Sequence, residues 1–418
     1  MAGYFVVLGD IKDEKGNTIK RAEDILCNML RYGTYSTNLS IKEGSKKWSK
    51  PKVATFADYF GMKENDYIFF FSNRKIYGVG KLVNIGQECK YWAFEGANRP
   101  ATYSQEQVDK TKLTADITPE NRCICFFRPV FYYAKSIDMD EALTSYPASF
   151  KSLRVIQNRT FIKLDDEEAD ALFAVLNRKN VSTEKNAPND WTPPIFDESM
   201  HNIAKTKISA HPEYYSFNIK SLLANYECWE GDGIREEMVI EAAVIDALTK
   251  KENNLVFDKL AYVSHQVSAS PAKPVEYMEW IDIFGYSVSD YLIEQKIPIT
   301  FAINQYYVIE IKRDALALPA PKRGKETAQI RKNKAAANQL MKYVDWVAKN
   351  YASGNYPMVK AILIANDFDT AFIDYCKKMC IRNYNNGYRD STPAVWENFE
   401  LIKYSFDGTN ITFEKIIQ

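Results

Sequence analysis

Two carboxylates and a lysine stand in predicted strands at positions where a purely structural sheet would carry apolar side chains. Asp282 lies within the apolar run 280–284, and Glu310 and Lys312 lie in the run 307–312. Because side chains alternate along a strand, Glu310 and Lys312 share one face of it. Ionised groups on a buried strand are unfavourable unless they are paired or bind a metal. These three residues are therefore the first candidates for chemistry.

The chemistry that suits this set is the hydrolysis of phosphodiester bonds. Two carboxylates on adjacent strands can hold a hard divalent cation, which prefers oxygen ligands and keeps several waters. Such an ion polarises a phosphoryl oxygen and lowers the pKa of a bound water. A lysine beyond the second carboxylate can orient that water and stabilise developing negative charge. The alternative is a buried ion pair of Glu310 with Lys312 or Asp282 that does no chemistry.

The elements around these residues predict a mixed-sheet α/β domain with helices on both faces. A predicted helix at 234–248 precedes predicted strands at 261–267, 277–286 and 305–313. A helix at 334–350 follows, with Gln339 and Tyr343 on one face because they are four residues apart. A strand at 359–365, a helix at 370–380 and a hairpin of 401–406 with 411–416 complete the domain.

The first half of the chain predicts a different domain, an α+β fold with a barrel-like sheet. Its signals are a strand at 4–8, a helix at 21–30, a hairpin within 66–85, strands at 123–133 and 153–164, and a closing helix after residue 165. Pro- and Asn-containing breakers interrupt any regular period afterwards. We therefore predict a first domain at 1–180, a linker at 181–213 and a second domain at 214–418.

Composition limits the function classes. The 418 residues predict two or three domains, and 54 lysines plus arginines balance 54 aspartates plus glutamates. Only three histidines are present, which argues against a histidine-built metal site or a histidine triad. No apolar run approaches about 18 residues, so no spanning helix is expected. The first residues lack the layout of a secretory signal, and a cytoplasmic location is expected.

The order αβββαβ, together with these motifs, resembles the restriction-endonuclease-like PD-(D/E)XK nuclease superfamily. The resemblance rests on Asp282, on Glu310-Ile311-Lys312 and on the Gln-x-x-x-Tyr helix. With the following strand 360–365, it is similar to the Shedu antiphage nucleases and to NucS-type mismatch endonucleases. This likeness implies that Asp282, Glu310 and the carbonyl of Ile311 bind Mg²⁺ or Mn²⁺ and that Lys312 is catalytic.

The same likeness assigns roles on the two helices. Gln339 and Tyr343 would support the site or the scissile phosphate. A glutamate of the first helix often completes such sites, and both Glu237 and Glu241 qualify, with a slight preference for Glu237. Members of this superfamily often assemble so that two sites face two strands of DNA, so a homo-oligomer is expected.

A basic segment lies between the predicted catalytic strand and the following helix. Residues 312–334 carry eight basic and two acidic side chains, an excess of six positive charges in a neutral chain. We predict that this segment contacts phosphates beside the site, independently of base sequence; the alternative is an ordinary solvated loop. The predicted DNA-binding residues are Arg313, Lys322, Arg323, Lys325, Arg331, Lys332 and Lys334.

The hairpin at 65–80 and the segment 159–164 resemble PUA- and EVE-type barrels. In those families the barrel reads RNA or a modified, flipped base in an aromatic pocket. A regulatory or oligomerisation domain is the alternative, and aromatic side chains of small barrels more often belong to the core. The candidate base-pocket aromatics are Trp48, Tyr91, Trp92, Phe94 and Tyr103.

Taken together, these features predict a metal-dependent DNA endonuclease. Its role would be antiphage defence or modification-dependent restriction, with phage or modified DNA as the partner and the first domain as a sensing or regulatory unit. The main alternative is a non-catalytic nucleic-acid-binding protein with a degenerate nuclease core. An RNA-directed nuclease is a third interpretation.

Overall fold

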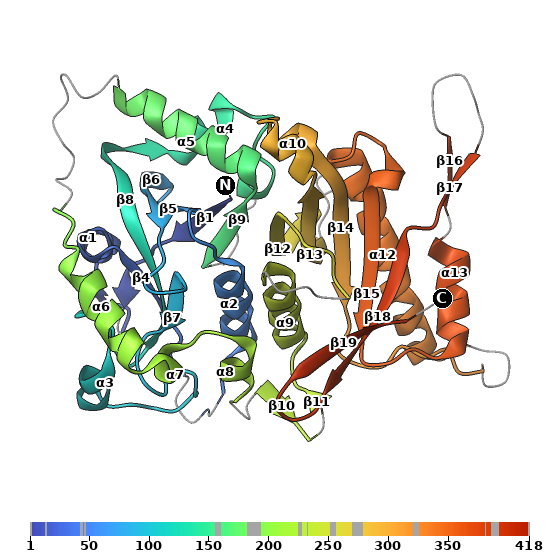
Figure 1. The fold of residues 1–418 in the computed structure, drawn as a ribbon, viewed down its shortest axis with the longest axis horizontal. Coiled ribbons are helices and arrows are strands. Elements are labelled where there is room, and N and C mark those ends of the chain that lie inside the picture. Colours follow the sequence, from blue (N-terminus) through green and yellow to red (C-terminus); the bar gives the residue numbers. More distant parts are fainter. Residues whose placement is uncertain are drawn as a thin grey trace. The chain divides into compact units, whose positions relative to one another are not determined.

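The computed structural model divides the chain into two compact units, Met1–Glu227 and Cys228–Gln418 (Figure 1). It describes residues 2–12, 15–41, 45, 47–154, 160–181, 194–224, 228–231, 233–250, 256–269, 279–320, 326–380, 382–385 and 393–416. No helix within these ranges is both long and apolar enough to cross a membrane. Each unit is described by itself below.

The first unit is built on a seven-stranded sheet that curls into a half-barrel. Its strand order is β4-β8-β6-β5-β1-β9, and β7 pairs with β8 beside this path. Strand β1 runs parallel to β5 and antiparallel to β9. The elements are β1 (Gly3–Val7), β2 (Ile11–Lys12), β3 (Thr18–Lys20), α1 (Ala22–Tyr32), β4 (Thr34–Asn38), α2 (Lys50–Gly61), β5 (Tyr67–Ser72), β6 (Lys75–Leu82), β7 (Lys90–Trp92), α3 (Gln105–Thr111), β8 (Asn121–Asp138), α4 (Met139–Ser145), a 3₁₀ turn (Ser152–Arg154), β9 (Phe161–Leu164), α5 (Asp166–Val181), α6 (Ser199–Ala210), α7 (Pro212–Tyr215) and α8 (Ile219–Leu223).

Continuous apolar runs explain this sheet, because strands covered on both faces need no alternation. In β5, Ile68, Phe69 and Phe70 are all fully buried. Phe69 faces a cluster that Leu172 and Leu176 of α5 complete. The predicted barrel-like α+β domain is thus confirmed as a curled half-barrel sheet covered by helices.

Part of the predicted linker is a packed helix. Residues 199–210 form α6, in which His201, Ala204 and Ile208 are buried. The imidazole Nε2 of His201 lies 3.1 Å from the carbonyl oxygen of Gly33. The predicted linker of 181–213 is therefore too long. The proline-containing segment before this helix interrupts the sequence pattern, so the helical spacing of its apolar residues was missed. Residues 182–193 of that linker lie outside the described residues.

The second unit contains a six-stranded mixed sheet of order β12-β13-β14-β15-β18-β19. Strands β12, β13 and β14 are antiparallel neighbours, whereas β14, β15 and β18 run parallel. The elements are β10 (Trp229–Glu230), β11 (Gly233–Ile234), α9 (Glu237–Thr249), β12 (Tyr262–Ala269), β13 (Glu279–Val288), α10 (Asp290–Glu294), α11 (Ile299–Ala302), β14 (Ile303–Ile311), α12 (Ala328–Asn350), a 3₁₀ turn (Tyr356–Met358), β15 (Val359–Ala365), α13 (Thr370–Cys380), β16 (Arg382–Asn385), β17 (Pro393–Trp396), β18 (Phe399–Phe406) and β19 (Ile411–Lys415).

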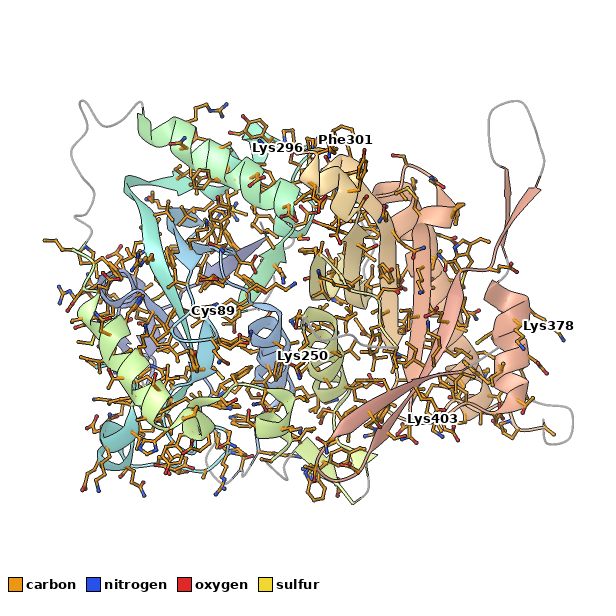
Figure 2. All side chains as sticks on the ribbon, viewed as in Figure 1. Cys89, Lys250, Lys296, Phe301, Lys378 and Lys403 are labelled. Carbon is orange, nitrogen blue, oxygen red and sulfur yellow. The ribbon has the colours of Figure 1, made fainter. Side chains whose placement is uncertain are left out.

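This element order confirms the predicted mixed-sheet α/β plan of the second half. The parallel step from β14 to β15 needs a long crossover, and α12 supplies it. Two short helices, α10 and α11, connect β13 to β14 and carry the exposed side chain of Phe301 (Figure 2). Since Asp282 stands near the start of β13 and Glu310 near the end of antiparallel β14, this connection lies at the opposite end of the strand pair from them.

A buried carboxylate holds the segment before β9 against α5 in the first unit. Glu168 Oε1 accepts hydrogen bonds from the backbone N–H groups of Lys151, Ser152 and Leu153, at 2.5, 2.7 and 3.2 Å. Burial, with the nearby charge of Asp165, raises the pKa of Glu168 to about 8, although the three N–H donors lower it. The protonated form is therefore favoured in the folded protein at neutral pH.

We expect Glu168→Gln to change the pH dependence of stability. The folded pKa of about 8 lies above the ordinary value of 4.5. Stability from the protonated group is therefore fully present below about pH 4 and is lost as the pH rises through about 8. Glutamine keeps an oxygen for the three donors but does not ionise.

The melting temperature of Glu168→Gln relative to wild type should thus be higher at pH 8.5 than at pH 5. Thermal unfolding at the two pH values measures this. A difference that is the same at both values would contradict the raised pKa of Glu168.

Candidate active site

Strands β13 and β14 bring the two predicted metal ligands together. Their ladder ends at the pair Ile283 and Ile309. One step further in the same register, Asp282 comes opposite Glu310. Beyond the last pair, the carboxylate of Asp282 takes the place of a backbone acceptor, because Ile311 N donates to its Oδ2 at 2.7 Å. The paired part of β13 and β14 therefore ends where the two acids meet.

Glu310 is the most deeply buried charged group of this site. Its side chain has no exposed surface, and Lys312 Nζ donates to its Oε1 at 2.6 Å. Burial raises the pKa of Glu310 to about 7, while Lys312 acts in the opposite direction. The second oxygen, Oε2, is buried and accepts no hydrogen bond from the described residues. A buried carboxylate oxygen in this state is suited to bind a cation.

The lysine does not neutralise the cluster. Burial raises the pKa of Asp282 well above its usual range, and the charges of Glu310 and Glu241 raise it further. For Lys312, burial acts downward, but Glu310 and Asp282 outweigh it and raise the pKa. One ammonium thus faces several carboxyl groups, two of which have raised pKa values because they are desolvated and lie close to other acids.

The two candidate glutamates of α9 lie in different environments. Glu237 is exposed, and its Oε1 accepts a hydrogen bond from Arg313 N at 3.2 Å. Glu241, one turn later, is only 2% exposed. The charges of both raise the pKa of Glu310, whereas only Glu241 is among the main influences on Asp282. The structure therefore favours Glu241 over Glu237 as a partner of Asp282.

A residue that sequence reasoning missed joins Glu241 to Asp282. Gln266 Nε2 donates to Glu241 Oε1 at 3.0 Å and to Asp282 Oδ1 at 3.3 Å. Gln266 has a φ of +50°, which is uncommon for a non-glycine residue within a strand. A polar pair, His265-Gln266, in the strand facing Asp282 was the only sequence signal for it.

Helix α12 places Gln339 and Tyr343 together, as their spacing predicts. Gln339 Nε2 donates to the phenolic oxygen of Tyr343 at 2.7 Å. Burial raises the pKa of Tyr343 to about 12, and Glu310 and Asp282 raise it too, against the effect of Gln339. The buried phenol is therefore neutral and within the field of the two acids.

The site offers only a small set of ligands for a divalent cation. No group of three or more histidine, cysteine, aspartate or glutamate side chains in the described ranges is arranged so that it could hold a metal ion. The expected set, however, needs only Asp282, Glu310 and the Ile311 carbonyl. The unpartnered Oε2 of Glu310 is the chemical reason to expect such an ion.

The basic segment is only partly described. Arg313 contacts Asp314 and the Arg235 carbonyl, and Lys334 pairs with Glu326 and lies 5.3 Å from the Tyr375 ring centroid. Arg331 and Lys332, at the start of α12, are exposed. Lys322, Arg323 and Lys325 lie outside the described residues.

The five aromatic residues predicted for a base pocket do not share one. Trp48, Tyr91, Trp92 and Phe94 are buried. The indole N–H of Trp48 donates to the Leu39 carbonyl, and Tyr91 donates to the Ile85 carbonyl. Trp92 and Tyr103 line a pocket of about 440 Å³, but Trp48, Tyr91 and Phe94 do not. These aromatics serve mainly as core, because small barrels must fill their interior with large apolar groups.

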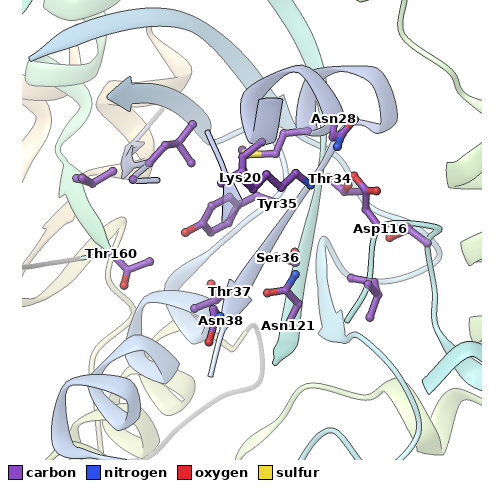
Figure 3. A pocket seen from close by; sticks show the side chains of 17 residues that line it. Lys20, Asn28, Thr34, Tyr35, Ser36, Thr37, Asn38, Asp116, Asn121 and Thr160 are labelled. Carbon is purple, nitrogen blue, oxygen red and sulfur yellow. The ribbon is translucent and has the colours of Figure 1, made fainter. Parts of the chain in front are cut away.

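A second pocket of the first unit has a wall of mixed polar and apolar side chains. It has a volume of about 250 Å³ and lies between the end of β1, helix α1, strand β4 and the start of β8 (Figure 3). Asn28, Ser36, Asp116 and Asn121 are among its lining residues. Its size lies below the roughly 300–1,000 Å³ of pockets for drug-sized ligands, so it suits a small polar group.

Two solved structures align with part of this chain. No protein-family model matches the chain, and no curated protein matches its sequence. Human THYN1, solved in complex with 5-methylcytosine-containing DNA, aligns at 17% identity over 45% of this chain and 100% of that chain, with a TM-score of 0.25. The DUF55 domain of human thymocyte nuclear protein 1 aligns at 15% identity over 41% of this chain and 97% of that chain, also with a TM-score of 0.25.

Lys312→Met should destabilise the second unit, because it leaves the buried Glu310 carboxylate without its ammonium partner. We expect a loss of about 1–3 kcal/mol in the free energy of unfolding at pH 8. The matched control is Lys403→Met, which removes a 2.9 Å ion pair to a largely exposed Asp367. That change should stay within about 1 kcal/mol. Urea denaturation measures the free energy of unfolding of both variants. Equal losses would contradict the expected cost of leaving the buried Glu310 without its ammonium partner.

Proposed function

We propose that this chain is a metal-dependent DNA endonuclease that hydrolyses phosphodiester bonds at the β13–β14 site. The observation that carries the proposal is Glu310, which is fully buried beside Asp282 and Lys312 and keeps one carboxylate oxygen without a partner. Because burying an unsatisfied polar atom is unfavourable, a cation bound at this oxygen would stabilise it.

Each residue of the site has its own proposed role. Asp282, Glu310 and the Ile311 carbonyl would hold Mg²⁺ or Mn²⁺, which supplies Lewis acidity when bound. Lys312 leaves Glu310 to orient the attacking water and to stabilise negative charge on the phosphoryl oxygens. Tyr343, held by Gln339, would offer a neutral phenolic donor, and the charges of Glu310 and Asp282 act on its pKa.

Phosphate contacts would come from the basic segment next to this site. Arg331 and Lys332 are exposed at the start of α12 and are available for such contacts. Arg313 and Lys334 already have acidic neighbours, so their contribution needs those contacts to exchange. Together with Lys322, Arg323 and Lys325, these side chains would bind the DNA backbone without regard to sequence.

The polar pocket of the first unit supports a sensing role in the same protein. Amide and hydroxyl groups can donate and accept hydrogen bonds at the edge of a base, which is how extruded bases are read. We propose that the pocket accepts one modified base of the DNA substrate. Modification-dependent restriction or antiphage defence would then be the biological role, and a homo-oligomer would place two sites on two strands.

Nuclease activity is tested with wild type, Glu310→Ala and Lys312→Ala. Each protein is incubated with unmodified and cytosine-modified plasmid DNA in Mg²⁺, in Mn²⁺ and in EDTA. We expect wild type to nick or break the DNA with either metal and not in EDTA, and both variants to lose at least about 100-fold in rate, since they remove interactions with the developing charge.

If both variants cleave as well as wild type, the site assignment is wrong. If wild type binds DNA but neither metal produces nicks on any DNA, the non-catalytic binding protein is the better interpretation. Cleavage of RNA in place of DNA would favour an RNA-directed nuclease.

The sensing pocket is tested by removing its polar groups at constant size. We expect Asn28→Leu and Asn121→Leu to abolish any preference for cytosine-modified over unmodified duplexes, while binding to unmodified DNA stays within twofold, because phosphate contacts supply that affinity. Fluorescence anisotropy measures both affinities, with Asn202→Leu on the exposed face of α6 as control. A preference that survives both pocket variants would exclude this pocket as the reader.

A further inference from the structure

The larger pocket of the first unit lies between two segments that are far apart in the sequence. Its wall comes from residues 92–107, which span β7, α3 and the loop between them, and from residues 213–221 of α7 and α8. Trp92 Nε1 donates to Ser221 Oγ at 2.9 Å, and Asn98 Nδ2 donates to the Ser221 carbonyl at 3.1 Å. These hydrogen bonds hold the two segments together. The volume of about 440 Å³ lies within the roughly 300–1,000 Å³ of small-molecule sites.

Two half-buried tyrosines, Tyr103 and Tyr214, contribute to this wall. Arg122 Cζ lies 5.6 Å from the centroid of the Tyr103 ring. The His211 ring stacks on Tyr214, with 4.9 Å between the centroids and 13° between the planes. Neither Arg122 nor His211 belongs to the described lining of the pocket. Each tyrosine is therefore supported from outside the pocket and keeps ring surface for a ligand inside it.

The loop before α3 is shaped around the Tyr103 ring. The hydroxyl of Tyr103 donates to the Gly96 carbonyl at 3.0 Å. Gly96 has a φ of +79°, a conformation that favours glycine, and a Cβ at this position would lie 2.5 Å from the same hydroxyl. The ring is thus fixed in the wall by its own loop, and a ligand would not have to order it.

The charged side chains of the pocket favour a cation. Glu95 and Glu213 are exposed lining residues from its two sides, and Arg99 is the one basic side chain in the described lining, so the formal excess is one negative charge. Burial raises the pKa of Tyr215 to about 12, and the charge of Glu95 raises it too, which places Glu95 beside α7. Two carboxylates repel a phosphate group, so a nucleotide is a poor match for this pocket.

We propose that this pocket binds a small organic cation, whose ammonium group lies between Glu95 and Glu213 and contacts the rings of Tyr103 and Tyr214. Aromatic faces attract ammonium groups through the negative face of the ring, and nearby carboxylates supply the opposite charge. The site goes beyond the proposed hydrolysis and does not depend on it. It shares no lining residue with the pocket proposed for a modified base.

Isothermal titration calorimetry on the full chain, in EDTA and without DNA, tests this site. The probes are spermidine, a polyamine, and choline, a quaternary ammonium ion. We expect saturable binding of at least one of them, at one site per chain. Tyr214→Leu should weaken it about 5–30-fold because it removes a ring face, whereas Tyr214→Phe keeps the ring and should bind like wild type.

The acids are tested with Glu95→Gln and Glu213→Gln, each of which should weaken binding about tenfold by removing a charged acceptor. The matched control is Glu106→Gln, at an exposed acid of α3 outside the described lining, which lies 3.7 Å from Lys110. This control should bind like wild type. Melting temperatures near that of wild type show that each variant is folded.

Three results would overturn the inference. The first is that neither spermidine nor choline binds saturably. The second is an equal loss in Glu106→Gln and in both pocket variants, which indicates general attraction to an acidic surface. The third is binding of inorganic phosphate that Arg99→Leu abolishes, without binding of either cation, which identifies an anion site instead. Because no step requires cleavage or a metal, these results are separate from those that decide the endonuclease.

Discussion

The burial of carboxylates on neighbouring strands is the constraint on which the second unit depends. Glu310 has no exposed surface, and Asp282 and Glu241 lie beside it. Their mutual repulsion and lost hydration oppose folding, since a buried charge is stable only when paired or bound to a metal. A sheet held together by apolar contacts alone would not retain the buried Glu310 and Glu241 with the half-buried Asp282 beside them. Their presence is one ground for the proposed metal site.

Several partial compensations keep the acids in place. Lys312 contacts Glu310, the Ile311 N–H contacts Asp282, and the amide of Gln266 joins Asp282 to Glu241. One oxygen of Glu310 nevertheless stays without a partner among the described residues. The strained backbone at Gln266 belongs to the same arrangement, because it turns a side chain of β12 toward the acids. Strain and unpaired charge coincide here, as they do at functional sites.

The interior of the first unit is filled mainly by apolar and aromatic side chains. Its curled sheet is filled by aromatic side chains, and for that reason Trp48, Tyr91 and Phe94 are core residues rather than walls of a binding site. One remaining hollow is lined by polar side chains from α1, β4 and β8 together with apolar ones such as Leu8 and Met29. The residues that line it have no distinctive pattern in the sequence.

Local patterns determined much of this protein. Period and apolar runs predict the order αβββαβ, and alternation and four-residue spacing place Glu310 with Lys312 and Gln339 with Tyr343, because these relations are set within one element. Contacts between elements required the tertiary structure. Only packing distinguishes the buried Glu241 from the exposed Glu237, and only packing brings Gln266 to both acids. The helix 199–210 and the core role of the aromatics were missed for the same reason: burial is decided by what lies opposite a side chain, and a linear sequence does not contain that neighbour.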